Sequence, residues 1–100
     1  MRLISFGDSD KKGKRFKIVI EDNNGARKTF HFGSITGQTF IDHRDENKRA
    51  NYIARHSVNE NWNEVNPGSL SRYILWGDST ILYKNLEDFL EMFDIEYFHE

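Results

Sequence analysis

The chain contains no cysteine, a single proline and no long run of apolar residues. Without cysteine it can form neither a disulfide framework nor a thiolate site for zinc or catalysis, which fits a reducing intracellular setting. No apolar run approaches the ~20 residues that cross a bilayer as a helix. Charged residues also interrupt residues 1–14 too early for a signal peptide. We therefore expect a soluble protein that is not exported.

Motifs of common catalytic and cofactor sites are missing as well: the sequence has no GxSxG, GxGxxG, GxxxxGK[ST] or HExxH. The histidines lie too far apart in sequence for the i+2, i+3 or i+4 pairs of a metal site, and the pattern assigns a role to none of them: His31, His43, His56 and His99. Among 16 acidic residues some pair always looks suggestive, so no carboxylate pair is singled out. We expect no enzyme, no metal, no cofactor and no small-molecule substrate.

Composition indicates one domain with a thin core. Hydrophobic residues make up 37% of the chain, but aromatic residues make up 14%, and each aromatic side chain buries a large apolar area. A length of 100 residues suits a single hydrophobic core. We therefore expect a single domain over residues 1–100.

A β-hairpin is indicated near the start of the chain. Apolar residues occupy every second position of residues 16–21, which is the period of a half-buried strand. Asn24-Gly25 then favours a hairpin turn of type I′, which needs positive φ at both central residues. A return strand over residues 27–32 completes the predicted β-hairpin support at residues 14–33.

Residues 43–77 have the composition of a central helical unit. Asp45 is a suitable N-cap for a helix that follows it. An apolar stripe at i, i+3 and i+4 predicts its inward face: Ala50, Ile53 and Ala54. Pro67 suits the first turn of a second helix, which ends before Gly77.

The end of the chain predicts an acidic amphipathic helix over residues 85–94, capped by Asn85. After it, Tyr97 and Phe98 are expected to dock on the domain or on a partner. Weak alternation in residues 1–6 adds a short edge strand. The predicted fold class is α+β: a small hairpin-based antiparallel sheet packed by two short central helices and a C-terminal amphipathic helix.

The net charge of −2 hides an asymmetry along the chain. Residues 1–56 carry 12 Lys and Arg against 7 Asp and Glu, whereas residues 57–100 carry 2 against 9. A domain polarised in this way can bind a polyanion at one end, or join copies or neighbours of opposite charge.

Basic side chains are therefore the candidate residues for a partner or a polyanion. Arg44, Lys48 and Arg55 are spaced by four and seven, so they line one outer face if the helix begins near Arg44. Four more occur in a polar stretch predicted to be a loop: Lys11, Lys12, Lys14 and Arg15. Such a patch can neutralise phosphates of DNA or RNA. The pI of about 6.1 and the acidic second half disfavour a nucleic acid, and an ordinary solvated surface explains the same charges.

Both tryptophans lie in the central unit and have two interpretations: anchors of the protein's own core, or exposed residues for a protein partner. Arg72 and Trp76 are four residues apart, a spacing that allows a structural cation–π contact. A purely structural role requires that the helical unit enclose both Trp62 and Trp76. If the indoles instead border a polar cleft with imidazoles and carboxylates, an active site must be considered.

The motif pattern resembles a family of small uncharacterised proteins of large DNA viruses, over about residues 14–77. Its members show HFG, HKD, YxxRH and GSxSRxxLW elements. The residues that correspond here are His31, Phe32 and Gly33; His43, Arg44 and Asp45; Tyr52, Arg55 and His56; and Gly68, Ser69, Ser71, Arg72, Leu75 and Trp76. Arg44 departs from the usual lysine, and the acidic end of the chain has no counterpart. The resemblance implies a viral origin more than a function.

This resemblance and the split charge lead to two functional hypotheses. The first is a small virion structural protein, a minor capsid component that bridges or cements larger coat proteins, located in the virion and in the host cytoplasm during assembly. The alternative is a virus-encoded nucleic-acid-binding accessory protein that uses a basic helix face.

Overall fold

The fold class is α+β, as the sequence predicts. The structure, a computed structural model, describes residues 1–97. Its strands are β1 (Arg2–Asp8), β2 (Lys14–Glu21) and β3 (Arg27–Ser34), and its helices are α1 (Phe40–His43), α2 (Glu46–His56), α3 (Pro67–Leu70), the π-helix η1 (Ser71–Leu75) and α4 (Leu82–Met92). The predicted docking of Phe98 and any role of His99 lie outside the described residues.

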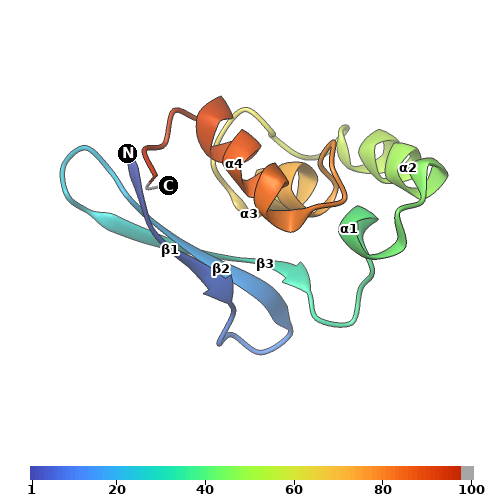
Figure 1. Ribbon diagram of the computed structural model, residues 1–100, viewed down its shortest axis with the longest axis horizontal. Helices are drawn as coiled ribbons and strands as arrows, with labels where there is room; N and C mark the ends of the chain where they lie inside the picture. Colours follow the sequence, from blue (N-terminus) through green and yellow to red (C-terminus); the bar gives the residue numbers. More distant parts are fainter. Residues whose placement is uncertain (98–100) are drawn as a thin grey trace.

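The three strands form an antiparallel sheet in the order β1-β2-β3, and the helices gather on one face of it (Figure 1). The helix-facing side of β2 and β3 supplies four core residues: Phe16, Ile18, Ile20 and Phe32. The α3–η1 segment and α4 supply most of the opposing side: Leu70, Ile74, Leu75, Leu86, Phe89 and Leu90. The two-residue period of β2 and the helical period of α4 therefore meet in one core.

The predicted hairpin is present, but its turn is not of type I′. Gly25 has a φ of 84°, whereas Asn24 has no positive φ. The carboxylate of Asp22 explains the difference, because it accepts the backbone N–H groups of Asn24 and Ala26 at 2.8 and 3.0 Å. This side-chain turn needs a left-handed residue only at Gly25.

Helix α2 begins after the predicted cap, since the Asp45 carboxylate accepts the N–H groups of Asn47 and Lys48. The predicted inward face is wrong, however, because Ala50 and Ala54 are exposed. Tyr52 is buried instead, and it is flanked by partly buried residues of the same helix face: Arg49, Ile53 and His56. Polar and aromatic side chains of this face anchor α2 to the chain around Trp76.

Arg49 supplies one of these anchors: its Nε donates to the carbonyl oxygens of Trp76 and Gly77 at 3.2 and 2.9 Å. Its Nη2 also pairs with the Asp78 carboxylate at 2.7 Å. Tyr52 supplies the other anchor by stacking on Trp76, with ring centroids 4.2 Å apart and an interplanar angle of 5°. An arginine is tolerated on the inner face because its donors are satisfied there.

The role predicted for Asn85 is also wrong. Helix α4 begins at Leu82, and its N-cap residue Ile81 makes no side-chain capping bond. Asn85 lies inside the helix and is buried, and its amide bonds the backbone of Ile74 and Ser79. Asn85 therefore connects α4 to η1 and to the turn between them, instead of starting the helix.

Candidate functional site

Two adjoining cavities form a groove between α2, the segment that leads into α1, and the α3–η1 segment. The first has a volume of about 530 Å³ and is lined by Gln38, His43, Lys48, Asn51, Ala54, Arg55 and Trp76. The second, of about 410 Å³, has Lys14, Tyr52, His56, Glu60 and Ser71 among its lining residues. Both include Gln38 and Trp76. We call the two together the Trp76 groove.

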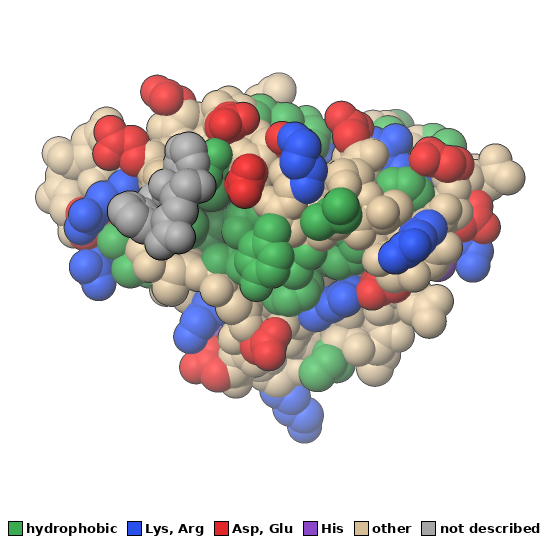
Figure 2. Space-filling model, viewed as in Figure 1, with side chains coloured by type: hydrophobic (Ala, Val, Ile, Leu, Met, Phe, Trp, Pro, Cys, Tyr) green, Lys and Arg blue, Asp and Glu red, His purple; other side chains and the backbone are tan. Residues whose placement is uncertain are grey.

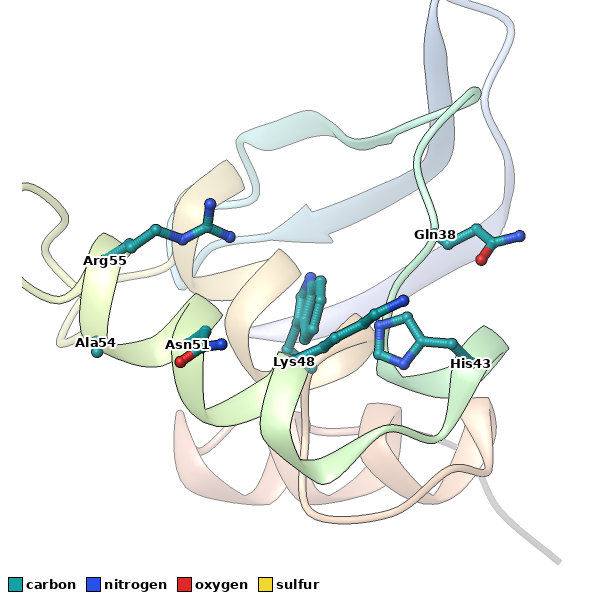
Figure 3. Close-up of a pocket in the computed structure, with 7 residues that line it drawn as sticks. Gln38, His43, Lys48, Asn51, Ala54 and Arg55 are labelled. Atoms are coloured by element: carbon teal, nitrogen blue, oxygen red, sulfur yellow. The ribbon is translucent and has the colours of Figure 1, made fainter.

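The first cavity is lined by hydrogen-bond donors and cations. Lys48 and Arg55 extend into it from α2, and His43 faces it from α1 (Figure 3). The amides of Gln38 and Asn51 add further donors, and no carboxylate lines this cavity. Such a lining favours an anion, because phosphate and carboxylate oxygens accept from all of these groups.

His43 brings a buried donor to this cavity. Its Nδ1 accepts the backbone N–H of Asp45 at 2.9 Å, so the neutral ring carries its proton on Nε2. That Nε2 is buried and has no hydrogen-bond partner within residues 1–97. The ring packs edge-on against Trp76, with centroids 5.2 Å apart, and Figure 3 shows it turned toward the end of the Lys48 side chain. A buried N–H without a hydrogen-bond partner is unfavourable for the fold.

Trp76 is held in place by the π-helix that precedes it. Its backbone N–H donates to the Ser71 carbonyl, a bond to the fifth residue back that closes η1. Its own carbonyl accepts from Arg49 and from Arg72 Nη1, the latter at 2.9 Å. The residue is 9% exposed. Since π-turns are frequent at functional sites, this fixed ring between two cavities is consistent with a binding role.

The second cavity contains an aromatic stack. Tyr52 lies between Trp76 and His56, whose ring centroid is 4.1 Å from that of Tyr52. His56 Nδ1 lies 2.5 Å from the Glu60 carboxylate, which also accepts the indole N–H of Trp62 at 2.9 Å. Burial, together with the charge of Glu60, raises the pKa of Tyr52 to about 12, so its hydroxyl stays neutral.

The two tryptophans differ in their surroundings. Trp76 is buried and borders the groove, whereas Trp62 is only half-buried, so one interior does not enclose both indoles. The guanidinium of Arg72 lies 5.3 Å from the ring centre of Trp62 and 5.0 Å from that of Tyr73. The sequence spacing predicted a cation–π contact between Arg72 and Trp76. Arg72 instead donates a hydrogen bond to the backbone carbonyl of Trp76. Trp62, Arg72 and Tyr73 therefore contact one another as one cluster.

The structure brings three of the predicted basic residues to the groove: Lys14, Lys48 and Arg55. Lys48 and Arg55 are exposed and make no ion pair within the described part of the chain. Arg44 is exposed too, but it lies outside α2 with a φ of 59°, so the predicted three-residue helix face is reduced to two. Lys11 and Lys12 are exposed in the β1–β2 loop and do not line the groove.

Arg15 is already paired within the protein. It lies in β2, not in a loop, and its guanidinium binds both carboxylate oxygens of Asp42 at 2.7 and 2.8 Å. The N–H and hydroxyl of Thr39 donate to the same carboxylate. The Arg15 guanidinium, aided by Thr39, holds the pKa of Asp42 at about 2, below its usual 3.8. This pair fixes α1, and with it His43, against the sheet.

Acid stability is expected to depend on Asp42. Because its pKa is lowered in the folded state, the pair stabilises the fold fully above the usual pKa of 3.8 and loses that effect as the pH falls toward about 2. Asp42→Asn should therefore lower the Tm near neutral pH, and the difference from the native protein should shrink as the pH falls below about 4. Thermal unfolding followed by circular dichroism across this range measures the effect. Asp8→Asn, at an exposed carboxylate of β1, is the control; an equal difference at every pH for Asp42→Asn would rule the explanation out.

A separate apolar patch lies where α4 meets β1. Figure 2 shows hydrophobic side chains gathered in the middle of this face. Tyr83 is 63% exposed and contacts Phe6 edge-on, with ring centroids 6.2 Å apart. Single exposed apolar residues are ordinary, whereas a contiguous patch is typical of contact surfaces.

The described residues 1–97 contain no group of three or more His, Cys, Asp or Glu side chains placed to hold a metal ion. Within the same residues no helix is both long enough and apolar enough to cross a bilayer.

The residues that sequence reasoning missed are mainly Gln38, Asn51 and the His56–Glu60 pair. Gln38 and Asn51 are polar residues without a motif, and only the fold places them beside Trp76. A signal for the pair did exist, since His56 and Glu60 are four residues apart. This spacing was not used because α2 ends at His56, and a spacing of four residues indicates a contact only within a helix.

Comparison with known proteins identifies relatives of the first half of the chain. The model of a family of unknown function (DUF5754) matches residues 4–56. Uncharacterized protein L851 of Acanthamoeba polyphaga mimivirus is 43% identical over 49 residues, which is 49% of this chain and 49% of that protein. The chain therefore spans about half the length of this relative. No solved structure matches. The mimivirus relative supports the predicted relationship to small proteins of large DNA viruses, while the individual motifs stay a prediction.

Proposed function

We propose that this chain, which belongs to the DUF5754 family of unknown function, is a nucleic-acid-binding accessory protein of a large DNA virus that acts through the Trp76 groove. Trp76 borders the groove beside His43, His56 and Glu60, but Trp62 lines neither cavity, so the cleft around both indoles that would point to an active site is not formed within residues 1–97. In this proposal the protein therefore binds without catalysis and needs no cofactor. The observation that carries the proposal is the first cavity, whose lining includes Lys48, Arg55 and several neutral donors but no carboxylate.

The charge state of the basic residues supports this role. A cation that serves a structural ion pair is already neutralised, as Arg15 is by Asp42. Lys48 and Arg55 are exposed, and neither forms an ion pair within residues 1–97. Unpaired cations beside a cavity bind phosphates and release counterions, which gives a salt-dependent affinity. The overall pI of about 6.1 disfavours a nucleic acid for the chain as a whole, but acidic side chains of α4 such as Glu87 and Glu91 lie outside the groove, whose lining includes Glu60 in the second cavity.

Removal of the two groove cations is expected to weaken binding. The double variant Lys48→Ala, Arg55→Ala should bind a labelled oligonucleotide about tenfold more weakly than the native protein at about 50 mM salt. The slope of log affinity against log salt concentration should also become shallower by about two, since each phosphate contact contributes about one to that slope. Fluorescence anisotropy at several salt concentrations measures both quantities.

A charge-matched variant provides the control. Lys28→Ala, Lys84→Ala removes the same net charge from β3 and α4, outside the groove, and should change the affinity by less than about twofold. If the two double variants weaken binding equally, the groove is not the site. If the native protein binds no oligonucleotide even at low salt, the proposed function is wrong.

A second candidate function is a small virion structural protein, most specifically a minor capsid component that joins coat proteins. The apolar patch around Phe6 and Tyr83 favours a protein partner, and the charge difference between the two halves could set its orientation. In this case the protein resides in the virion, and in the host cytoplasm during assembly. Proteomics of purified particles should then find it at many copies, and its absence from particles would exclude this role.

A further inference from the structure

The ring stack of the groove ends at His56. Tyr52 is covered on both sides, by Trp76 and by His56, with centroid separations of 4.2 and 4.1 Å. The His56 side chain is 38% exposed, and no further ring stacks on its other face among residues 1–97. A planar group that entered the second cavity could therefore extend the stack by one ring.

His56 is held rigidly for such a contact. Its Nδ1 is hydrogen-bonded to Glu60, and Glu60 is in turn held by the indole N–H of Trp62. These bonds fix the plane of the imidazole before any ligand arrives. A platform ordered in advance loses little side-chain entropy on binding.

The two cavities differ in charge, and this difference orients a ligand. Lys48 and Arg55 line the first cavity, whereas Lys14 and Glu60 both line the second, where their opposite charges balance. Phosphates are attracted more strongly to the first cavity, so a neutral group fits the second better. From Lys48 to His56 the helix rises about 12 Å, several times the ~3.4 Å spacing of phosphates along a stacked strand. A chain of nucleotides can therefore contact both ends.

From this arrangement we propose that the groove binds single-stranded nucleic acid, with one unpaired base stacked on His56 and the neighbouring phosphates at Lys48 and Arg55. The proposal rests on the proposed function and adds the substrate class. A duplex presents only base edges, since its base faces are covered by the neighbouring pairs. A single strand exposes the base face that His56 requires.

The test compares three labelled ligands at low salt by fluorescence anisotropy: a single strand, the matching duplex, and the same single strand with abasic sites. The native protein should bind the single strand about tenfold more tightly than the other two, because only it supplies a stackable base. His56→Ala should remove this preference and leave the affinities for the duplex and the abasic strand unchanged. His56→Phe keeps a ring without the bond to Glu60 and should retain most of the preference.

His31→Ala, which removes an imidazole on the sheet outside the groove, is the matched control and should behave as the native protein does. Equal affinity of the native protein for the intact and abasic strands would overturn the stacking proposal while leaving nucleic-acid binding in place. The stacking proposal would also be overturned if His56→Ala weakened the binding of all three ligands equally. Loss of the preference in His56→Phe would also count against it. Absence of binding to every ligand would overturn the proposed function, and this inference with it.

Discussion

Gly77→Ala is expected to lower the free energy of unfolding by about 3 kcal/mol or more. A Cβ atom at this position would lie 2.2 Å from the carbonyl oxygen of Tyr73 and 2.7 Å from Cγ of Asn85. Neither neighbour is the end of a flexible side chain: one is backbone, and the other is a buried, hydrogen-bonded amide. The glycine is required by this close approach, since Gly77 does not have a positive φ.

Urea and thermal unfolding measure this loss, and the Tm is expected to fall by more than about 10 °C for a domain of this size. Gly7→Ala is the matched control, because nothing lies within 4 Å of a Cβ built at that glycine of β1. We expect the control to change the free energy of unfolding by less than about 0.5 kcal/mol. If Gly77→Ala were as stable as the control, η1 and α4 could move apart to make room for the Cβ atom without a loss of stability, and the prediction would be wrong.

Asn85→Asp separates the role seen in the structure from the role suggested by the sequence. Asn and Asp are almost equivalent as N-caps, so a capping residue would tolerate the exchange. The buried Asn85 Nδ2 instead donates to the carbonyl oxygens of Ile74 and Ser79 at 2.9 and 2.7 Å. A carboxylate cannot donate to these oxygens, and it would also bury a charge against them. We expect a loss of about 4 kcal/mol in the free energy of unfolding.

Asp45→Asn provides the comparison for this variant. Asp45 is a genuine cap, whose carboxylate accepts from the first turn of α2, so the exchange should change stability by less than about 0.5 kcal/mol. Chemical denaturation of both variants near neutral pH gives the two values. Equal, small effects would mean that Asn85 does no more than a cap does.

Much of the fold follows from local patterns in the sequence. The alternation in β2, the glycine at the hairpin turn and the cap at Asp45 each depend on a few neighbouring residues, and each is found where it was predicted. The features that the sequence did not predict depend on residues far apart in the chain. Ala50 and Ala54 have the right spacing for a buried stripe, but Trp76 and Gly77 offer a ring face and two carbonyl groups, and Tyr52 and Arg49 turn α2 toward them.

The candidate site was only partly predictable for the same reason. Basic charge is visible in the sequence, so Lys14, Lys48 and Arg55 could be named as candidates. Which cations are neutralised depends on long-range partners: Arg15 meets Asp42 across 27 positions in the sequence. The groove itself combines side chains from separate segments, among them Gln38, His56 and Trp76, which no local spacing connects.

By itself the sequence determined the fold class, the hairpin, the start of α2 and the excess of basic residues in the first half of the chain, because propensity, capping and composition act within a few residues. Only the tertiary structure decided which face of α2 is buried, which cations remain unpaired and where Trp76 lies. These outcomes depend on the shape of neighbouring elements and on hydrogen bonds between residues far apart in the chain, since each buried polar group must find a partner wherever the fold provides one.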